Sequence, residues 1–362
     1  KWGRGSAEHE GFSIIMFLHG WLRLKTLLIA AMLALPAGQV GAAESFVRLT
    51  GSGASFPFPI YSVWFKNFSR SQDNVIVDYQ AKGSGAGIRD FINGTVDFAG
   101  SDAAITPEEA AQVGPGVQIV PATAGKIVLS YNLPMLSKPL RLSREAYAGI
   151  FLGEIARWNH PQIRATNPDA RLPDQNITVV RRADSSGTTY AFTNHLAAIG
   201  ETWRKRHGVG KTVVWSESDR FIAAPKNDGV AATVKQTPGA IGFIEYGFAK
   251  FARLAMAHLE NREGIFVEPT PASGRAALAS EPMPPHMLLW LPDPAGADAY
   301  PIVTYSWLLF YRHYENPAVA RTIHSLLEYC LTEGQAMAAE LGYIPLPEEA
   351  VQAVRAAMGN FH

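Results

Sequence analysis

The sequence predicts an α/β protein in which parallel β-strands are covered by helices on both faces. Patterns typical of buried strands alternate with amphipathic helical patterns from Phe46 onward. Three turns rich in glycine, serine and threonine each link a strand to a helix, at 51–56, 83–87 and 184–189. The 362 residues, 47% hydrophobic and 18% charged, suit two ordered domains with a sizeable core.

The N-terminal part of the predicted domain has a βαβαβ rhythm. In order, the expected elements are a strand at 46–49, a helix with the apolar stripe 60, 63, 64 and 68, a strand at 75–79, a helix around 88–92 and a strand at 96–99. This alternation predicts a parallel sheet, because each helix carries the chain back to the same end. Ligands of such sheets bind at the carboxyl ends of the strands, which is where the first two turns and Asp102 fall.

The rest of the chain predicts further elements of both kinds. Buried strands are expected at 127–132, 177–181 and 239–244, and a strand-like run at 301–311 that then turns helical. Helices are expected at 145–152, 190–199, 317–341 and 347–358. A polar loop is expected at 157–176 and an irregular connection at 268–301, where Pro, Ala, Ser and Gly dominate.

Residues 1–43 have the pattern of an export signal. Arg23 and Lys25 precede an apolar run, 26–35, that is too short to span a bilayer, and small residues at Ala42 and Ala43 suit a signal peptidase. A membrane anchor at the N-terminus is the alternative. The single cysteine, Cys330, permits no disulfide within a monomer, and no cysteine follows the signal to carry a lipid. We therefore expect a soluble periplasmic monomer that is not lipid-anchored, with Cys330 in the core.

The composition and motifs argue against several functions. A net charge of +0 lacks the basic excess typical of nucleic-acid binding. The segment 208–212 imitates the end of a P-loop, but Lys205 stands where its first glycine is required, so we expect a solvated loop. No serine has glycine two positions before and after it, and the ten histidines show no metal-ligand spacing. The sequence predicts no catalytic residues, no metal site and no cofactor.

The three turns together indicate a site for a small oxyanion. A helix N-terminus presents free backbone N–H groups and a positive dipole end, glycine permits close approach, and hydroxyls add donors. Each turn alone is more simply an ordinary helix start. Arg182 beside the third turn adds planar donors suited to an anion, and Asp184 can pair with that arginine.

Five segments in this order resemble the periplasmic phosphate-binding proteins of phosphate ABC importers, the PstS type. They are GSGASFPFPIY, YQAKGSGAG, VDFAGSDA, VVRRADSSGTT and PGAIGFIEY, and the likeness extends from about Phe46 to Met358. The resemblance implies the two-lobed type II periplasmic-binding-protein fold, each lobe a mostly parallel sheet with helices on both faces, joined by a hinge of crossing strands. Lobe 1 would comprise 44–127 and 303–362, and lobe 2 would comprise 128–302. It also implies a non-enzymatic receptor that delivers inorganic phosphate to permease subunits.

The resemblance assigns binding residues position by position. In lobe 1 these are Ser55 and Phe56 through their backbone N–H groups, Ser84 and Asp102; in lobe 2 they are Arg182, Ser186, Gly187 and Thr188, with Asp184 in support. Three positions depart from the family's pattern: Ser55 replaces a common Thr, Gly85 a common Ser, and Ser185 a common Gly.

Asp102 is the informative member of this set, because a carboxylate that faces an anion needs a ligand with a proton to donate. Protonated phosphate has one and fully ionised sulfate has none, so we expect Asp102 to discriminate against sulfate. A receptor for another tetrahedral oxyanion, such as sulfate, molybdate or arsenate, is the alternative; Asp102 counts against sulfate but does not exclude arsenate. A secreted phosphoester hydrolase and a cell-surface adhesion or matrix protein are alternatives from other classes.

Overall fold

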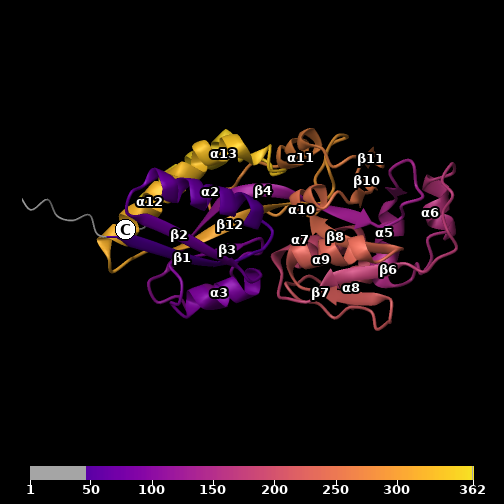
Figure 1. Ribbon diagram of the computed structural model, residues 1–362, viewed down its shortest axis with the longest axis horizontal. Coiled ribbons are helices and arrows are strands. Elements are labelled where there is room, and N and C mark those ends of the chain that lie inside the picture. The colour runs from indigo at the N-terminus through magenta and orange to yellow at the C-terminus, as the bar shows by residue number, and fades with distance from the viewer. Residues whose placement is uncertain (1–45, 361) are drawn as a thin grey trace, which may run out of the picture. The chain divides into compact units, whose positions relative to one another are not determined.

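The computed structural model describes residues 46–360 and 362, so the predicted export signal at 1–43 lies outside the described residues. Its largest feature is a nine-stranded sheet in the order β2-β1-β3-β12-β4-β8-β6-β7, with β9 paired to β4 (Figure 1). Within this described part, no helix is both long enough and apolar enough to cross a membrane.

The first half of the sheet contains the predicted βαβαβ unit. Strand β1 (Val47–Gly53) pairs in parallel with β2 (Val75–Ala81) on one side and with β3 (Phe98–Ser101) on the other. Gly51 lets β1 pack against the Phe98 ring of β3, because a Cβ at position 51 would lie 2.3 Å from Phe98 Cζ. The three predicted strands are confirmed, with β1 longer and β3 starting later than expected.

The second half repeats the parallel arrangement. Strand β6 (Thr178–Arg182) pairs in parallel with β8 (Ala240–Glu245) and with β7 (Phe221–Ala224). The first two strands were expected. β7 was not expected, because this strand is only four residues long and only one of the four is buried.

Two antiparallel strands join the halves at the centre of the sheet. β4 (Val117–Tyr131) is 15 residues long; its residues 117–126 pair with β12 (Val303–Tyr311), and its residues 127–131 pair with β8. β4 changes partner between 126 and 127, one residue before the expected boundary between 127 and 128. The division into two lobes stays a prediction.

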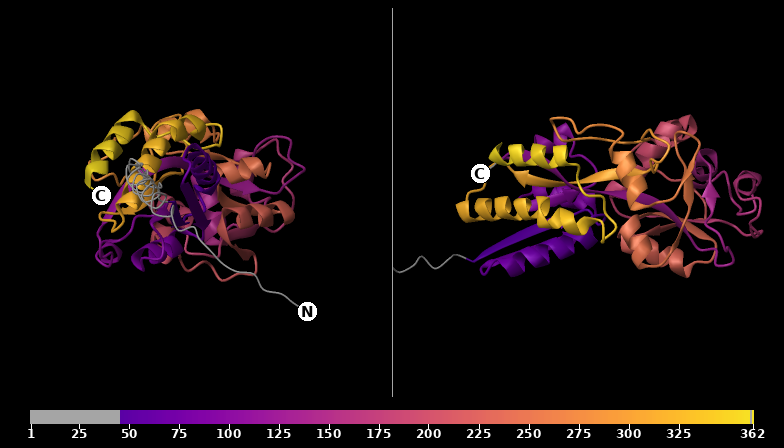
Figure 2. Two further views of the ribbon diagram at one scale, coloured as in Figure 1. Left: turned by 60° about the vertical axis from the view of Figure 1, so that its left-hand side comes forward. Right: turned by 90° about the horizontal axis from the view of Figure 1, so that it is seen from above.

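Helices cover both faces of the first half. α2 (Phe58–Ser71) and α12 (Pro317–Leu331) pack together on one face, and α3 (Ser84–Ile92) lies on the other (Figure 1). Cys330 is fully buried in α12, as expected. The single helix expected at 317–341 is wrong: the backbone breaks at Thr332, with φ −111° and ψ −92°, and α13 (Glu333–Ala338) follows. The C-terminal helices lie beside the N-terminal strands (Figure 2).

Helices also cover both faces of the second half. α7 (Gly187–Ile199) packs through Phe192 against Phe243, whereas α9 (Lys226–Gln236) shares a separate apolar cluster with Val180. Adjacent strand residues point to opposite faces, which explains the two clusters. α9 was not expected, because its 11 residues include few apolar ones.

The remaining elements surround this sheet. They are α4 (Pro107–Ala110), β5 (Arg141–Leu142), α5 (Arg144–Leu152), α6 (Pro161–Thr166), α8 (Glu201–Arg206), α10 (Tyr246–Phe251), β9 (Ala255–Met256), β10 (His258–Glu260), β11 (Phe266–Val267), α11 (Pro271–Leu278), α14 (Glu348–Ala357) and the short η1 (Met358–Asn360). β11, β10 and β5 form a second, three-stranded sheet. The expected loop at 157–176 contains α6, and the irregular stretch at 268–301 contains α11, both of which begin at a proline that the sequence analysis took as a loop signal.

Candidate functional site

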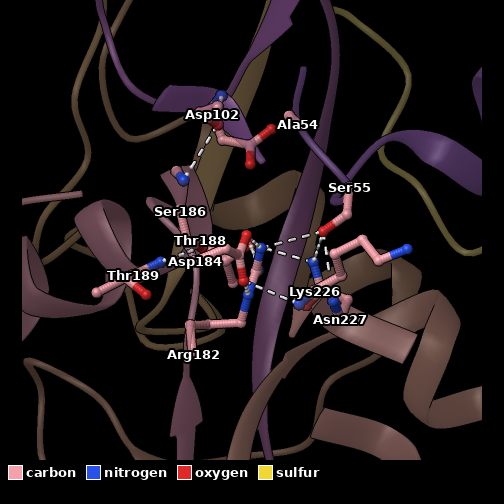
Figure 3. A network of polar contacts seen from close by, with 12 residues as sticks. Ala54, Ser55, Asp102, Arg182, Asp184, Ser186, Thr188, Thr189, Lys226 and Asn227 are labelled. Carbon is pink, nitrogen blue, oxygen red and sulfur yellow. Dashed lines mark hydrogen bonds and ion pairs between the residues drawn. The ribbon is translucent and has the colours of Figure 1, made fainter. Parts of the chain in front are cut away.

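The predicted site residues come together where the two halves of the sheet meet. The turns after β1, β2, β3 and β6 all lie at the carboxyl ends of parallel strands. Gly187 donates its backbone N–H to Ser84 Oγ at 3.1 Å, which joins one half of the sheet to the other. Arg182 Nη2 donates to Ser55 Oγ at 3.2 Å and joins them a second time (Figure 3). The side chains of the site are buried: Ser55, Phe56, Ser84, Asp102, Arg182, Ser186 and Thr188.

Arg182 is the cation of the site, and Asp184 holds it. Arg182 Nε and Nη2 donate to the two carboxylate oxygens of Asp184 at 2.8 and 2.5 Å. Burial by itself raises the pKa of Asp184, but the hydrogen bonds and charge of Arg182 lower that pKa overall. The predicted pair is therefore present, and the fork geometry fixes the guanidinium plane at the end of β6.

Three hydroxyl groups of the site have their lone pairs occupied by N–H donors. Ser84 Oγ accepts from the backbone N–H of Asp102 and Gly187, at 3.3 and 3.1 Å. Ser55 Oγ and Thr188 Oγ1 both accept from Arg182 and from Asn227. None of the hydrogen bonds within residues 46–360 and 362 uses these hydroxyls as donors. A hydroxyl has one proton and two lone pairs, so each is left as a donor to a further acceptor.

Ser186, Gly187 and Phe56 complete the predicted set. Ser186 Oγ caps α7 by accepting from Thr189 N at 3.0 Å, and Gly187 has no room for a side chain, since a Cβ would lie 2.8 Å from Asp102 Oδ2. A hydrogen bond fixes the backbone of Phe56, whose carbonyl accepts from Tyr343 Oη at 2.6 Å.

Asp102 is fully enclosed and its two oxygens differ. Ser306 Oγ donates to Oδ1 at 2.8 Å, whereas Oδ2 lies near Gly187. Burial raises the pKa of Asp102 to about 7, and the Ser306 hydrogen bond and the Arg182 charge only partly oppose this rise. Asp102 is therefore placed to exchange a proton near neutral pH.

Sequence reasoning missed Ser306 and Asn227. Ser306 lies in β12, and the available signal was a lone serine within the apolar run 302–311. Asn227 lies in the first turn of α9, a helix that the sequence analysis did not predict, and no motif marks it.

The segment 208–212 is a loop, as expected, with Val209 and Thr212 exposed, but its lysine is not solvated. Lys211 Nζ donates to Glu109 Oε1 and Oε2 at 3.0 and 3.2 Å, and its side chain is only 19% exposed. Its carbonyl accepts from Ser186 N at 2.8 Å, which ties the loop to the site. Among the residues that the structure describes, no group of three or more His, Cys, Asp and Glu side chains could hold a metal ion.

Comparisons with known proteins show the family of this chain. Residues 40–333 match the model of the PBP superfamily domain. The chain is 38% identical over 313 residues to a phosphate-binding protein PstS of Pasteurella multocida, covering 85% of this chain and 89% of that protein. It is 35% identical over 327 residues to a PstS of Methanocaldococcus jannaschii, covering 84% of each.

Solved structures show the same fold. A periplasmic phosphate-binding protein called PfluDING, bound with phosphate, aligns with a TM-score of 0.71 at 20% identity, over 86% of this chain and 94% of that one. A phosphate-binding protein from Stenotrophomonas maltophilia aligns with a TM-score of 0.66 at 22% identity, over 86% and 93%. From the family match and the identities to curated relatives, this chain belongs to the PBP superfamily and, within it, to the PstS family of phosphate-binding proteins.

Proposed function

We propose that this protein is a receptor that captures inorganic phosphate in the periplasm and delivers it to an ABC importer, without performing chemistry on it. The relatives that share 33–38% of its residues are PstS phosphate-binding proteins. Belonging to a solute-binding family also argues against the hydrolase and adhesion alternatives.

The observation that carries this proposal is the set of buried donors that converge from both halves of the sheet. The hydroxyls of Ser55, Ser84 and Thr188 each have a proton left to donate, and Arg182 adds a buried cation beside them. Backbone N–H groups of Ser55 and Phe56, together with the Ser186 hydroxyl, complete a set suited to the oxygens of a tetrahedral anion, and Gly187 contributes through its N–H to Ser84 Oγ.

Asp102 makes the proposed site selective for a protonated anion. Its Oδ2 faces the donors while Ser306 occupies Oδ1, so the carboxylate can accept one hydrogen bond from the ligand. Phosphate supplies that proton near neutral pH. Fully ionised sulfate does not, and it would face a buried carboxylate without a partner.

Capture would follow from closure of the two lobes. Ligand residues come from both lobes, and a ligand bound by both stabilises the closed form. β4 and β12, which join the lobes, are the expected hinge. The closed form would then dock on the permease subunits as a monomer, with no role for nucleic acid.

Isothermal titration of the phosphate-stripped protein tests the proposal. We expect tight binding of phosphate, weak or no binding of sulfate, and no release of product from a chromogenic phosphoester. Equal binding of sulfate and phosphate would refute the role of Asp102, and turnover of the ester would refute the receptor function. Binding of arsenate but not phosphate would assign the site to the other protonated oxyanion.

A further inference from the structure

Asn227 connects the hydroxyls of two predicted ligands from opposite halves of the sheet. It is fully buried in the first turn of α9. Its side-chain Nδ2 donates to Ser55 Oγ and to Thr188 Oγ1, both at 3.2 Å (Figure 3). Its backbone N–H also donates to Ser55 Oγ, at 3.3 Å.

The orientation of the Asn227 amide follows from a third contact. The backbone N–H of Glu245 donates to Asn227 Oδ1 at 3.0 Å. A backbone N–H can only donate, so the atom that faces Glu245 must be the carbonyl oxygen. The NH₂ group is therefore directed to Ser55 and Thr188, and the amide cannot flip without losing all these contacts.

This orientation controls the hydroxyl protons. Ser55 Oγ lies within hydrogen-bond distance of three N–H donors, two on Asn227 and one on Arg182, and the two from Asn227 are enough to use both of its lone pairs. Thr188 Oγ1 accepts one hydrogen bond from Asn227 and one from Arg182. Neither hydroxyl can donate to the Asn227 NH₂ or N–H, because these groups have no free acceptor site. Even when Arg182 turns to a ligand, Ser55 keeps its proton available.

The backbone at the start of α9 is held in the conformation that these contacts need. Lys226 has φ +57°, in the left-handed region that costs free energy for a residue with a side chain. Its N–H donates to Asp184 Oδ1 at 2.9 Å, the carboxylate oxygen that also binds Arg182 Nε. Asn227 is thus anchored to the same pair that positions the cation.

We propose that Asn227 is a positioning residue that directs the hydroxyl protons of Ser55 and Thr188 to the bound oxyanion. The proposal rests on the proposed phosphate-binding function. Asn227 acts through the two hydroxyls, and it makes the pocket reject ligands that cannot accept hydrogen bonds at those two points.

Two substitutions of Asn227 test this role by titration with phosphate. Asn227→Ala removes the donor and is expected to weaken binding about tenfold, as for lost hydrogen bonds to a charged ligand. Asn227→Asp keeps the acceptor for Glu245 but presents oxygen to Ser55 and Thr188. Their hydroxyls would then donate to the carboxylate, so we expect a larger loss, about a hundredfold.

A double-mutant cycle separates positioning from a structural effect. In a Ser55→Ala/Thr188→Val background, Asn227→Ala is expected to change phosphate affinity less than about twofold, because there are no hydroxyls left to direct. An equal loss in both backgrounds, or wild-type affinity of Asn227→Ala, would overturn the proposal. The matched control is Asn132→Ala, since Asn132 ties the other end of α9 through the carbonyls of Val234 and Lys235. It should leave affinity unchanged.

Neutron diffraction of the wild-type phosphate complex tests the same point without a variant. Deuterons of Ser55 and Thr188 that lie toward ligand oxygens support the proposal, and deuterons that lie elsewhere overturn it. If the wild-type protein binds no phosphate at all, the proposed function fails, whatever Asn227 does.

Discussion

Gly85 and Ser185 meet across the interface between the two halves of the sheet. The backbone N–H of Gly85 donates to the Ser185 carbonyl at 3.1 Å, and a Cβ on Gly85 would lie 2.1 Å from Ser185 Oγ. The Ser185 side chain therefore occupies the space that a side chain at position 85 would need.

Gly85→Ser is therefore expected to hinder the closed form. A side chain at position 85 collides with Ser185, and overpacking of this kind costs about 1–3 kcal/mol, which is roughly fivefold to a hundredfold in phosphate affinity by titration. The double variant Gly85→Ser/Ser185→Gly should recover most of the loss. Gly114→Ser is the control, because a Cβ on Gly114 meets nothing within 4 Å. Failure of the double variant to recover would show that the two positions are not coupled.

Asp102→Asn is expected to relax selection between phosphate and sulfate. The amide can donate to an oxygen without a proton, so sulfate affinity should rise while phosphate affinity falls. Competition titrations would measure the ratio, which we expect to fall at least about tenfold. Asp73→Asn, an exposed change far from the turns in sequence, should leave the ratio unchanged. An unchanged ratio in Asp102→Asn would remove this residue from the specificity mechanism.

The stability of the unliganded protein is expected to depend on pH through Asp102. Its pKa is about 7 in the folded protein against an ordinary value of 3.8, so between these pH values the folded state holds a proton that the unfolded state has lost. Stability from this group is complete below pH 3.8 and is lost as pH rises to about 7. At 1.36 kcal/mol per pKa unit, the loss approaches about 4 kcal/mol.

Urea unfolding at several pH values checks this expectation. Asp102→Asn should match the wild type near pH 4 and exceed its unfolding free energy at pH 8, because the amide does not ionise. Burial also raises the pKa of Glu245, to about 8. Glu245 is present in both proteins, so its contribution to the pH dependence cancels in the comparison. A difference that does not grow with pH would contradict the raised pKa of Asp102.

Arg182→Ala is expected to weaken phosphate binding by about 2 kcal/mol or more, because it removes the cation and leaves the partly buried Asp184 without its partner. Calorimetry would measure the loss. The control is Arg181→Ala. Within the described part of the chain, the Arg181 side chain makes its only hydrogen bond to the Arg182 carbonyl. Near-wild-type affinity of Arg182→Ala would exclude it from the site.

Glu109→Gln is expected to speed phosphate release. The Lys211–Glu109 ion pair joins α4 to the loop whose carbonyl binds Ser186 N, and its side chains are 19% and 29% exposed. A pair this accessible is worth about 1 kcal/mol at most, so stopped-flow dissociation should be up to roughly fivefold faster, with less dependence on salt. Glu108→Gln, the exposed neighbour on the same helix, should have no effect. Equal rates for both variants would exclude a role for the pair in closure.

Sequence reasoning succeeded where the signals are local. The turns at 51–56, 83–87 and 184–189 were located from small residues between a strand pattern and a helical pattern, and their convergence followed from parallel topology. It failed where the local signal is weak. α9 carries few apolar residues, so neither this helix nor Asn227 at its start could be found.

The sequence by itself determined the α/β class, the strands that end at the site and the donors that those ends present, because periodicity and turn chemistry depend on neighbours along the chain. Only the tertiary structure decided the partners of those donors. Three side-chain hydrogen bonds of the site each join residues at least 100 positions apart: Ser306 to Asp102, Asn227 to Ser55, and Lys211 to Glu109. The raised pKa of Asp102 has the same origin, because desolvation is a property of everything packed around a group and not of the residues beside it in the chain.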